Sequence, residues 1–209
     1  MKYLNYRLSA AMWSRVLLLW LVLAFGALVV GGAALAMGQF VQSNIRSELA
    51  AQQITFTPAD KLADPERALP GMVENGGQVL STGNQAQVYA GYIGLHLKES
   101  AEGAGYPDAS YATLGGVQRE LKAALATATT AGDQTAIDDA QKKLTDVTNL
   151  RNTMLTGSTL RGTLLSAYGW DNVATGITVV GVFILVLSLA FLVLFGYEQR
   201  RGHLPATEA

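Results

Sequence analysis

Two long stretches of the chain contain no charged side chain. The first covers residues 16–45, the second covers residues 172–197, and apolar residues dominate both. An α-helix needs about 20 residues to cross roughly 30 Å of hydrocarbon, so each stretch is long enough to span a bilayer. We predict transmembrane helices at residues 16–40 and 172–197, on either side of a water-soluble domain at residues 41–171. Aromatic residues of the kind expected at membrane–water interfaces flank the spans: Trp13, Trp170 and Tyr197.

The segment between the two stretches combines helical periodicity with loop. Residues 39–53 contain no Pro or Gly, so the first helix is expected to continue as a stalk, before an extended segment at residues 54–58. Pro and Gly then favour loop as far as residue 83. Apolar residues spaced by three or four predict helices at residues 84–101, 111–129 and 135–155, the last two as an antiparallel hairpin.

The chain between the hairpin and the second span is predicted to be interrupted. Thr156-Gly157-Ser158 is expected to end the hairpin, because glycine and serine disfavour a helix interior. A short amphipathic helix at residues 159–168 would then lie at the membrane surface. Residues 169–171 would begin the second span.

Basic residues close to the spans set the expected orientation. Three basic residues and no acidic residue precede the first span: Lys2, Arg7 and Arg15. Two more, Arg200 and Arg201, follow the second span within a few residues. Because basic residues near the membrane stay on the cytoplasmic side, residues 1–15 and 198–209 are predicted to be cytoplasmic. The predicted fold is mainly α, with two transmembrane helices in the plasma membrane flanking an extracytoplasmic helical domain.

A cleavable signal peptide is the alternative interpretation of the first span. The basic start, the apolar run at residues 16–30 and the tripeptide Ala34-Leu35-Ala36 match its three-part pattern. The uncharged stretch continues for nine residues past Ala36, however, whereas a mature protein is normally polar directly after its cleavage site. We expect the first span to be retained as an anchor.

Small residues follow one face of the first predicted span, at spacings of three and four: Ala24, Ala27, Gly31, Ala34 and Gly38, here called the small-residue stripe. Helices in lipid gain nothing from burying apolar surface against each other, so they pack through close approach along small side chains. The stripe is therefore a predicted helix-packing face. The alternative is that it only reflects the high Ala and Gly content of bacterial spans.

The composition argues against several kinds of chemistry. The chain has no cysteine, which excludes disulfides, thiolate metal sites and a cysteine nucleophile. Residues 46–171 carry ten basic and fourteen acidic side chains, a net charge of −4, with no basic patch for nucleic acid. Neither a nucleophile elbow nor a phosphate-binding loop is present in the sequence. The two spans contain no ionisable residue, so an ion path through this chain alone is not expected.

The two histidines, His96 and His203, are predicted to lie on opposite sides of the membrane. His96 and Glu99 are one helical turn apart, and Glu102 and Asp108 follow nearby in the sequence. A metal ion would need one or two more well-placed donors. We expect a partly exposed structural histidine, and we predict no catalytic, cofactor-binding or metal-binding residue.

Three parts of the chain carry a resemblance to a known group of proteins: residues 54–58, residues 83–90 with 96–99, and residues 160–170. They resemble two-span membrane proteins of actinobacteria of unassigned function. Some members of that group are labelled as small subunits of aromatic ring-opening dioxygenases. Such enzymes are soluble, their iron site belongs to the partner subunit, and this chain supplies no iron ligands. The resemblance therefore implies the architecture and a place in the cell envelope, and no activity.

These observations predict a non-enzymatic integral membrane protein that acts through protein contacts. It would be an accessory subunit of a larger envelope complex, respiratory or transport, or an envelope structural protein. Its expected partners are the lipid bilayer and either another membrane protein or a second copy of itself, with no nucleic acid and no cofactor. The alternative is an extracytoplasmic ligand-binding sensor, which would signal through a membrane partner because residues 198–209 are too few for a signalling domain.

Overall fold

The computed structural model describes the backbone of residues 10–201 and the side chains of residues 12–200. Within that range the chain divides into two compact units, one made of residues 10–44 and 172–201 and the other of residues 45–171. The described chain is mainly helical. Lys2, Arg7 and His203, which the sequence analysis singled out, lie outside the described residues.

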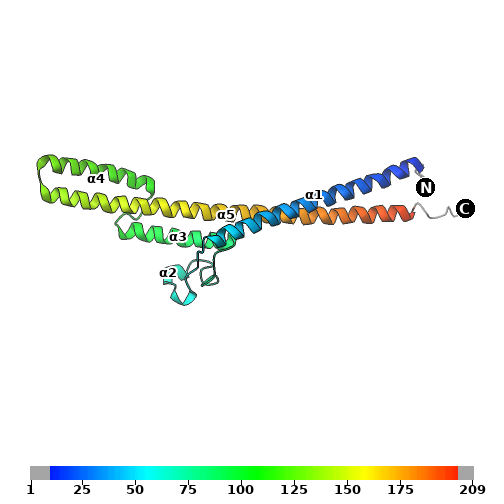
Figure 1. Cartoon of the computed structure of the whole chain (residues 1–209), viewed down its shortest axis with the longest axis horizontal. Helices are drawn as coiled ribbons and strands as arrows, with labels where there is room; N and C mark the ends of the chain where they lie inside the picture. Colours follow the sequence, from blue (N-terminus) through cyan, green and yellow to red (C-terminus); the bar gives the residue numbers. More distant parts are fainter. Residues whose placement is uncertain (1–9, 202–209) are drawn as a thin grey trace, which may run out of the picture. The chain divides into compact units, whose positions relative to one another are not determined.

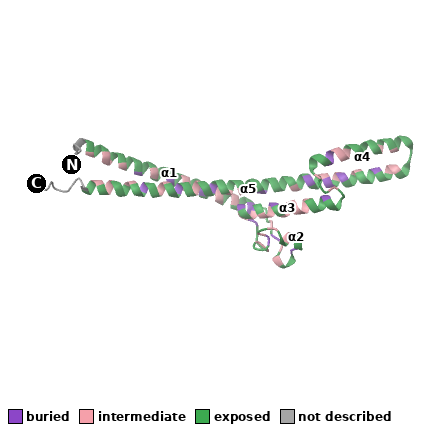
Figure 2. Cartoon of the chain, turned by 180° about the vertical axis from the view of Figure 1, so that it is seen from behind, coloured by how far each residue is buried: buried purple, intermediate pink, exposed green. Residues whose placement is uncertain are grey.

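The first unit is a pair of helices. It contains most of α1 (Ala10–Ala51) and the C-terminal part of α5 (Gln134–Arg201), which lie side by side in Figures 1 and 2. Both helices are long and apolar enough to cross a membrane, and only 11% of the most apolar stretch of each is buried. The uncharged residues 16–45 and 172–197 fall within these two helices. As predicted, α1 continues beyond the uncharged stretch as a stalk; it ends at Ala51, two residues before the end of the predicted stalk at residues 39–53.

The second unit begins with a compact loop region. Thr55 and Val79 form an antiparallel β-bridge, and the N–H groups of Phe56 and Leu80 donate to the carbonyls of Gln78 and Ile54 at 2.9 and 2.8 Å. The predicted loop contains two short helices, η1 (Ala59–Lys61) and α2 (Asp64–Arg67). Its apolar side chains form a core with α3 and α5, in which the most deeply buried large residues are Phe56, Met72 and Leu80.

Helix α3 (Gly83–Gly103) begins at a capping box. Thr82 accepts a hydrogen bond from the Gln85 N–H, and the Gln85 side chain accepts one from the Thr82 N–H, both at 3.2 Å. This exchange satisfies backbone donors that the first turn of a helix otherwise leaves unpaired. The helix spans the predicted range 84–101 and ends before Gly105, whose φ of +82° suits glycine.

Helix α4 (Tyr111–Ala131) and the first part of α5 form the predicted antiparallel hairpin. Gly132 ends α4 in the left-handed conformation, with φ +71°, and Asp133 accepts a hydrogen bond from the Ala136 N–H at 3.1 Å to begin α5. The hairpin shares an apolar cluster with the end of α3, whose buried members are Ala101, Leu114, Val147, Leu150 and Met154.

The predicted interruption between the hairpin and the second span is wrong. Helix α5 runs without a break through residues 156–158, 159–168 and 169–171 to Arg201, so there is no separate surface helix. Residues 134–201 contain no proline to remove a backbone donor. Gly157 packs against α3, since a Cβ on it would lie 2.5 Å from Leu97 Cδ2, and the Ser158 hydroxyl donates to the Met154 carbonyl within the same helix. Glycine here permits close packing and does not end the helix.

This role predicts that Gly157→Val destabilises the protein by about 1–3 kcal/mol, because the new side chain overpacks the contact with Leu97. Gly162→Val is the matched control, since a Cβ on Gly162 meets nothing within 4 Å. The thermal midpoint of helix loss, measured by circular dichroism in detergent, should fall for the first variant and stay near wild type for the second. Equal midpoints for the two variants would contradict the assigned contact.

Candidate functional site

The contact between α1 and α5 is built from small side chains at every seventh position. On α1 these are Ala24, Gly31 and Gly38, and on α5 they are Ala174, Gly181 and Ser188; all six are buried. A seven-residue recurrence keeps one face of each helix turned toward its partner. Ala27 and Ala34, the other members of the small-residue stripe, are intermediate in exposure.

The glycines in this contact leave no room for a side chain. A Cβ on Gly31 would lie 2.8 Å from Leu185 Cγ and 3.0 Å from the Gly181 carbonyl oxygen. A Cβ on Gly38 would lie 3.0 Å from the Ala174 carbonyl oxygen. Gly31 contacts Gly181, whereas Gly38, which comes later in α1, contacts Ala174, which comes earlier in α5. The two helices therefore run antiparallel.

Two hydrogen bonds join the same helices. The buried Ser188 hydroxyl donates to the Ala24 carbonyl at 2.7 Å, and the Gln42 side chain donates to Thr175 Oγ1 at 3.0 Å. In an apolar environment such a bond contributes about 0.6–2 kcal/mol, because neither group has water as an alternative partner. The bonds lie near the two ends of the small-residue contact and fix its register.

Large apolar side chains lie on the outside of this helix pair. Phe25 on α1 is 66% exposed, Phe183 on α5 is 62% exposed, and many Leu and Val side chains are similarly exposed. A water-soluble core has the opposite arrangement, with large residues inside. Within the pair, Trp20 and Phe191 are in contact, with ring centroids 5.8 Å apart. The aromatic residues expected at the interfaces differ in exposure, since Trp170 and Tyr197 are 62% and 60% exposed and Trp13 is intermediate.

His96 connects α3 to α2 in the second unit. Its Nε2 lies 3.0 Å from Glu66 Oε1 and its Nδ1 lies 3.1 Å from Glu99 Oε2. The Nε2 contact has an ion-pair distance without hydrogen-bond geometry. Glu102, the nearby acid considered as a metal ligand, instead pairs with Lys98 at 3.6 Å. Among the described residues no three His, Cys, Asp or Glu side chains are grouped in a way that could hold a metal ion.

A row of aromatic rings leads from the loop core to His96. Neighbouring centroids are 5.3 Å apart from Phe56 to Tyr89, 5.3 Å apart from Tyr89 to Tyr92, and 4.4 Å apart from Tyr92 to His96. Burial raises the pKa of Tyr89, and Tyr92 beside it raises that pKa further. The Tyr89 phenol is therefore uncharged at neutral pH, and the row serves to pack α3 onto the loop.

Arg151 holds the hairpin together from the α5 side. Its Nε donates to the Tyr111 carbonyl at 3.2 Å, one terminal nitrogen donates to Gln118 Oε1 at 3.1 Å, and the guanidinium lies 4.0 Å from the centroid of the Tyr111 ring. Gly115 provides the space, because a Cβ there would lie 3.4 Å from the guanidinium. Arg151 therefore lies on the face of α5 that packs on α4, where a carbonyl, an amide oxygen and an aromatic ring contact its guanidinium.

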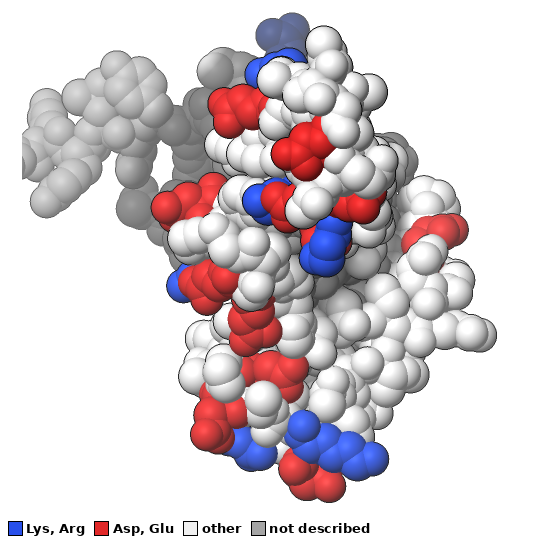
Figure 3. All heavy atoms as spheres, turned by 90° about the vertical axis from the view of Figure 1, so that its left-hand side faces the viewer, with Lys and Arg blue, Asp and Glu red and all other residues white. Residues whose placement is uncertain are grey.

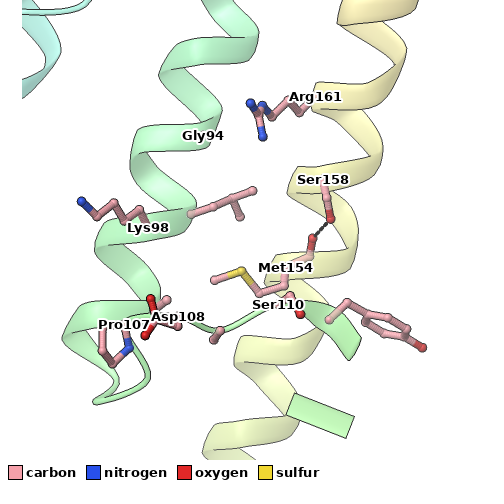
Figure 4. A pocket seen from close by; sticks show the side chains of 12 residues that line it. Gly94, Lys98, Pro107, Asp108, Ser110, Met154, Ser158 and Arg161 are labelled. Atoms are coloured by element: carbon pink, nitrogen blue, oxygen red, sulfur yellow. Dashed lines mark hydrogen bonds between the residues drawn. The ribbon is translucent and has the colours of Figure 1, made fainter. Parts of the chain in front are cut away.

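A pocket of about 380 Å³ lies between α3, the connection before α4, and α5. Leu97, Ala101 and Met154 form an apolar part of its wall, and Arg161, Lys98 and Asp108 supply charge. Figure 4 shows the Arg161 side chain extending from α5 toward Gly94 on α3. Sequence analysis missed this site, because its residues come from three separate segments without a shared motif.

Charges elsewhere on the second unit are mixed. On α5, Lys142 pairs with Asp146 at 3.0 Å and Lys143 with Asp139 at 2.8 Å; the hydrogen bond to Asp139 raises the pKa of Lys143. The face drawn in Figure 3 likewise shows acidic and basic side chains interspersed, without a continuous basic patch. This face therefore lacks the clustered positive charge typical of a nucleic-acid interface.

No protein-family model, curated protein or solved structure matches this chain. The resemblance to two-span actinobacterial membrane proteins therefore stays a prediction.

The helix contact predicts a specific cross-link. A Cβ on Gly181 would lie 3.1 Å from the Ala34 Cβ, slightly less than the Cβ–Cβ distance of roughly 3.5–4.5 Å between two disulfide-bonded cysteines. Because the chain has no cysteine of its own, Ala34→Cys with Gly181→Cys should form one intramolecular disulfide on mild oxidation, measured by mass after thiol alkylation.

Adding Gly31→Leu to this cysteine pair should lower the disulfide yield by roughly tenfold, since overpacking by about 1–3 kcal/mol separates the helices. Gly32→Leu is the control, because a Cβ on Gly32 meets nothing within 4 Å. An unchanged yield with Gly31→Leu would show that the stripe reflects composition alone.

Proposed function

We propose that this chain is a two-span integral membrane protein that acts through protein contacts. In this proposal α1 and the C-terminal part of α5 cross the plasma membrane as an antiparallel pair, and residues 45–171 form an extracytoplasmic domain. The protein would serve as an accessory subunit of a larger envelope complex, respiratory or transport, or as an envelope structural protein.

The observation that carries the membrane assignment is the arrangement of side chains by size in the helix pair. Small residues such as Gly31 and Gly181 are buried, whereas Phe25 and Phe183 are more than 60% exposed. A soluble monomer rarely exposes so much contiguous apolar surface. Hydrocarbon satisfies the large side chains, and close backbone approach with dispersion contacts holds the small faces together.

The orientation rests on the basic residues near the spans. Arg15 precedes the uncharged stretch of α1, and Arg200 and Arg201 follow that of α5. Basic residues close to the membrane favour the cytoplasmic side, which supports cytoplasmic termini and an outward-facing domain. Retention of the first span fits with its role in the helix pair, since cleavage after Ala36 would remove Gly31 from Leu185 and Gly181.

The small-residue stripe does not provide the contact with a partner, because its buried members pack against α5 of the same chain. Partner contacts would use other surfaces. Large apolar side chains of the extracytoplasmic part of α5 are candidates, since Leu155, Leu160 and Leu165 are each 40–45% exposed outside the uncharged stretch. Such residues supply contact area at protein interfaces.

A ligand-binding sensor is the second candidate function. It is favoured by the pocket of about 380 Å³ beside Arg161, which lies within the 300–1,000 Å³ range typical of small-molecule sites. In this alternative the signal passes to a partner within the membrane.

The orientation predicts opposite behaviour for two reporter fusions. A reporter enzyme that works only in the cytoplasm should be active when fused after residue 209 and inactive when fused after Ala131. A reporter enzyme that works only outside the cytoplasm should show the reverse. A periplasmic phosphatase paired with a cytoplasmic galactosidase gives both measurements on each fusion. Exchange of the two results would overturn the proposed topology.

The proposed role in a complex predicts that the protein, extracted in mild detergent, co-purifies with a defined set of membrane proteins. Replacing Leu155, Leu160 and Leu165 together by Ser should reduce that set, because the exposed apolar contact area is lost. Lys142→Ser with Lys143→Ser is the control on the exposed hairpin. A homogeneous monomer or dimer from wild-type membranes would contradict the subunit role.

A further inference from the structure

The charge of Arg161 is unpartnered within the described chain. Its guanidinium makes no ion pair or hydrogen bond there, although fourteen acidic residues lie within residues 46–171. The nearest acids in the sequence of α3 are already paired, Glu99 with His96 and Glu102 with Lys98. Arg151, ten residues earlier on the same helix, is bonded through Nε and one terminal nitrogen and stacks on the Tyr111 ring. Unlike Arg151, Arg161 therefore makes no hydrogen bond or ion pair with another element of the described chain, although its side chain lies beside Gly94 of α3.

The Arg161 side chain lies across from a glycine on α3. Gly94 of α3 has no side chain, and a Cβ built on it would lie 3.5 Å from Arg161 Nε and 3.7 Å from its Cζ. A larger side chain at position 94 would project into the pocket next to the guanidinium. In Figure 4 Arg161 and Gly94 face each other across the gap between the two helices.

The remaining walls of the pocket differ in chemistry from the charged end. Leu97, Ala101 and Met154 present apolar surface, and Ala101 and Met154 belong to the second apolar cluster. The hydroxyls of Ser110 and Ser158, which also line the pocket, are already bonded, to Thr113 and to the Met154 carbonyl. Arg161 is thus an exposed guanidinium without a partner among the described residues, at the edge of an open pocket whose wall is partly apolar and partly polar.

We propose that this pocket binds a small amphipathic organic anion, whose carboxylate or phosphate group pairs with Arg161 and whose apolar body lies against Leu97, Ala101 and Met154. A guanidinium offers two parallel N–H donors that match the two oxygens of a carboxylate or phosphate. Asp108 disfavours a second negative charge near the α4 end of the pocket, so the preferred ligand carries its charge at one end. The proposal does not depend on the role in an envelope complex.

The test uses the full chain in phosphatidylcholine nanodiscs and three probes. 4-Phenylbutyrate combines a carboxylate with an apolar body, 4-phenylbutan-1-ol has the same body without the charge, and inorganic phosphate has the charge without the body. We expect saturable binding of 4-phenylbutyrate by ligand-observed NMR, after subtraction of empty nanodiscs, and at least about tenfold weaker binding of the other two. Absence of saturable binding by 4-phenylbutyrate overturns the proposal.

Matched variants locate the binding. Arg161→Gln should weaken 4-phenylbutyrate about tenfold or more, the loss expected for a charge-assisted pair. Gly94→Leu should weaken it by filling the pocket with no change of charge. Arg119→Gln removes one positive charge from an exposed position on α4 outside the pocket and should bind as wild type. Circular dichroism verifies that each variant is folded, and equal affinities of all three variants would overturn the proposal.

The same anionic group could come from a lipid or from a water-soluble molecule, and a lipid exchange separates the two sources. Nanodiscs containing phosphatidylglycerol in place of half of the phosphatidylcholine should abolish 4-phenylbutyrate binding if the natural ligand is an anionic headgroup. Undiminished binding assigns the site to a soluble organic anion.

Discussion

Helix α5 is the element against which the other long helices pack, and its unbroken course is the constraint on which the structure depends. Helix α4 packs against its first part at residues such as Val147, and α3 packs against its middle at Gly157. Helix α1 packs against its C-terminal part at Gly181. Glycine occurs in α5 at two of these contacts because the neighbouring helix comes close enough to exclude a side chain, and the lost helix propensity of about 1 kcal/mol is offset by packing.

The two units solve the packing problem in opposite ways. In residues 45–171 large side chains such as Phe56, Met72 and Leu114 are fully buried, as in a water-soluble core. In the helix pair the buried positions hold Gly, Ala and Ser, and the large side chains point outward. Water drives the first arrangement by excluding apolar surface. The second needs surroundings as apolar as the side chains themselves, which is the physical basis for proposing a bilayer around it.

Polar groups in the second unit divide into those that hold the fold and those that are available to a ligand. Arg151 joins α5 to α4 through its hydrogen bonds and the Tyr111 ring, and His96 joins α3 to α2 through its 3.0 Å contact with Glu66, so both side chains connect elements of the fold. Arg161 lies on the same helix as Arg151, is exposed, and makes no ion pair or hydrogen bond within the described residues. A ligand at this guanidinium would have to order an exposed side chain, which costs about 0.5–1.5 kcal/mol and has to be offset by the charge-assisted pair and the apolar contacts.

The sequence by itself determined the helical class, the two long apolar helices and the antiparallel hairpin, because these follow from periodicity and from charge-free length. The turn at Gly132 is also local, and so is the cap at Thr82, which the structure revealed: each depends on residues within four positions. Only the tertiary structure decided whether Gly157 ends a helix or accommodates a neighbour, because that depends on Leu97, sixty residues away. The Arg161 pocket was also decided only by the tertiary structure. No local pattern in the sequence indicates that Gly94 on α3 and Arg161 on α5 face each other.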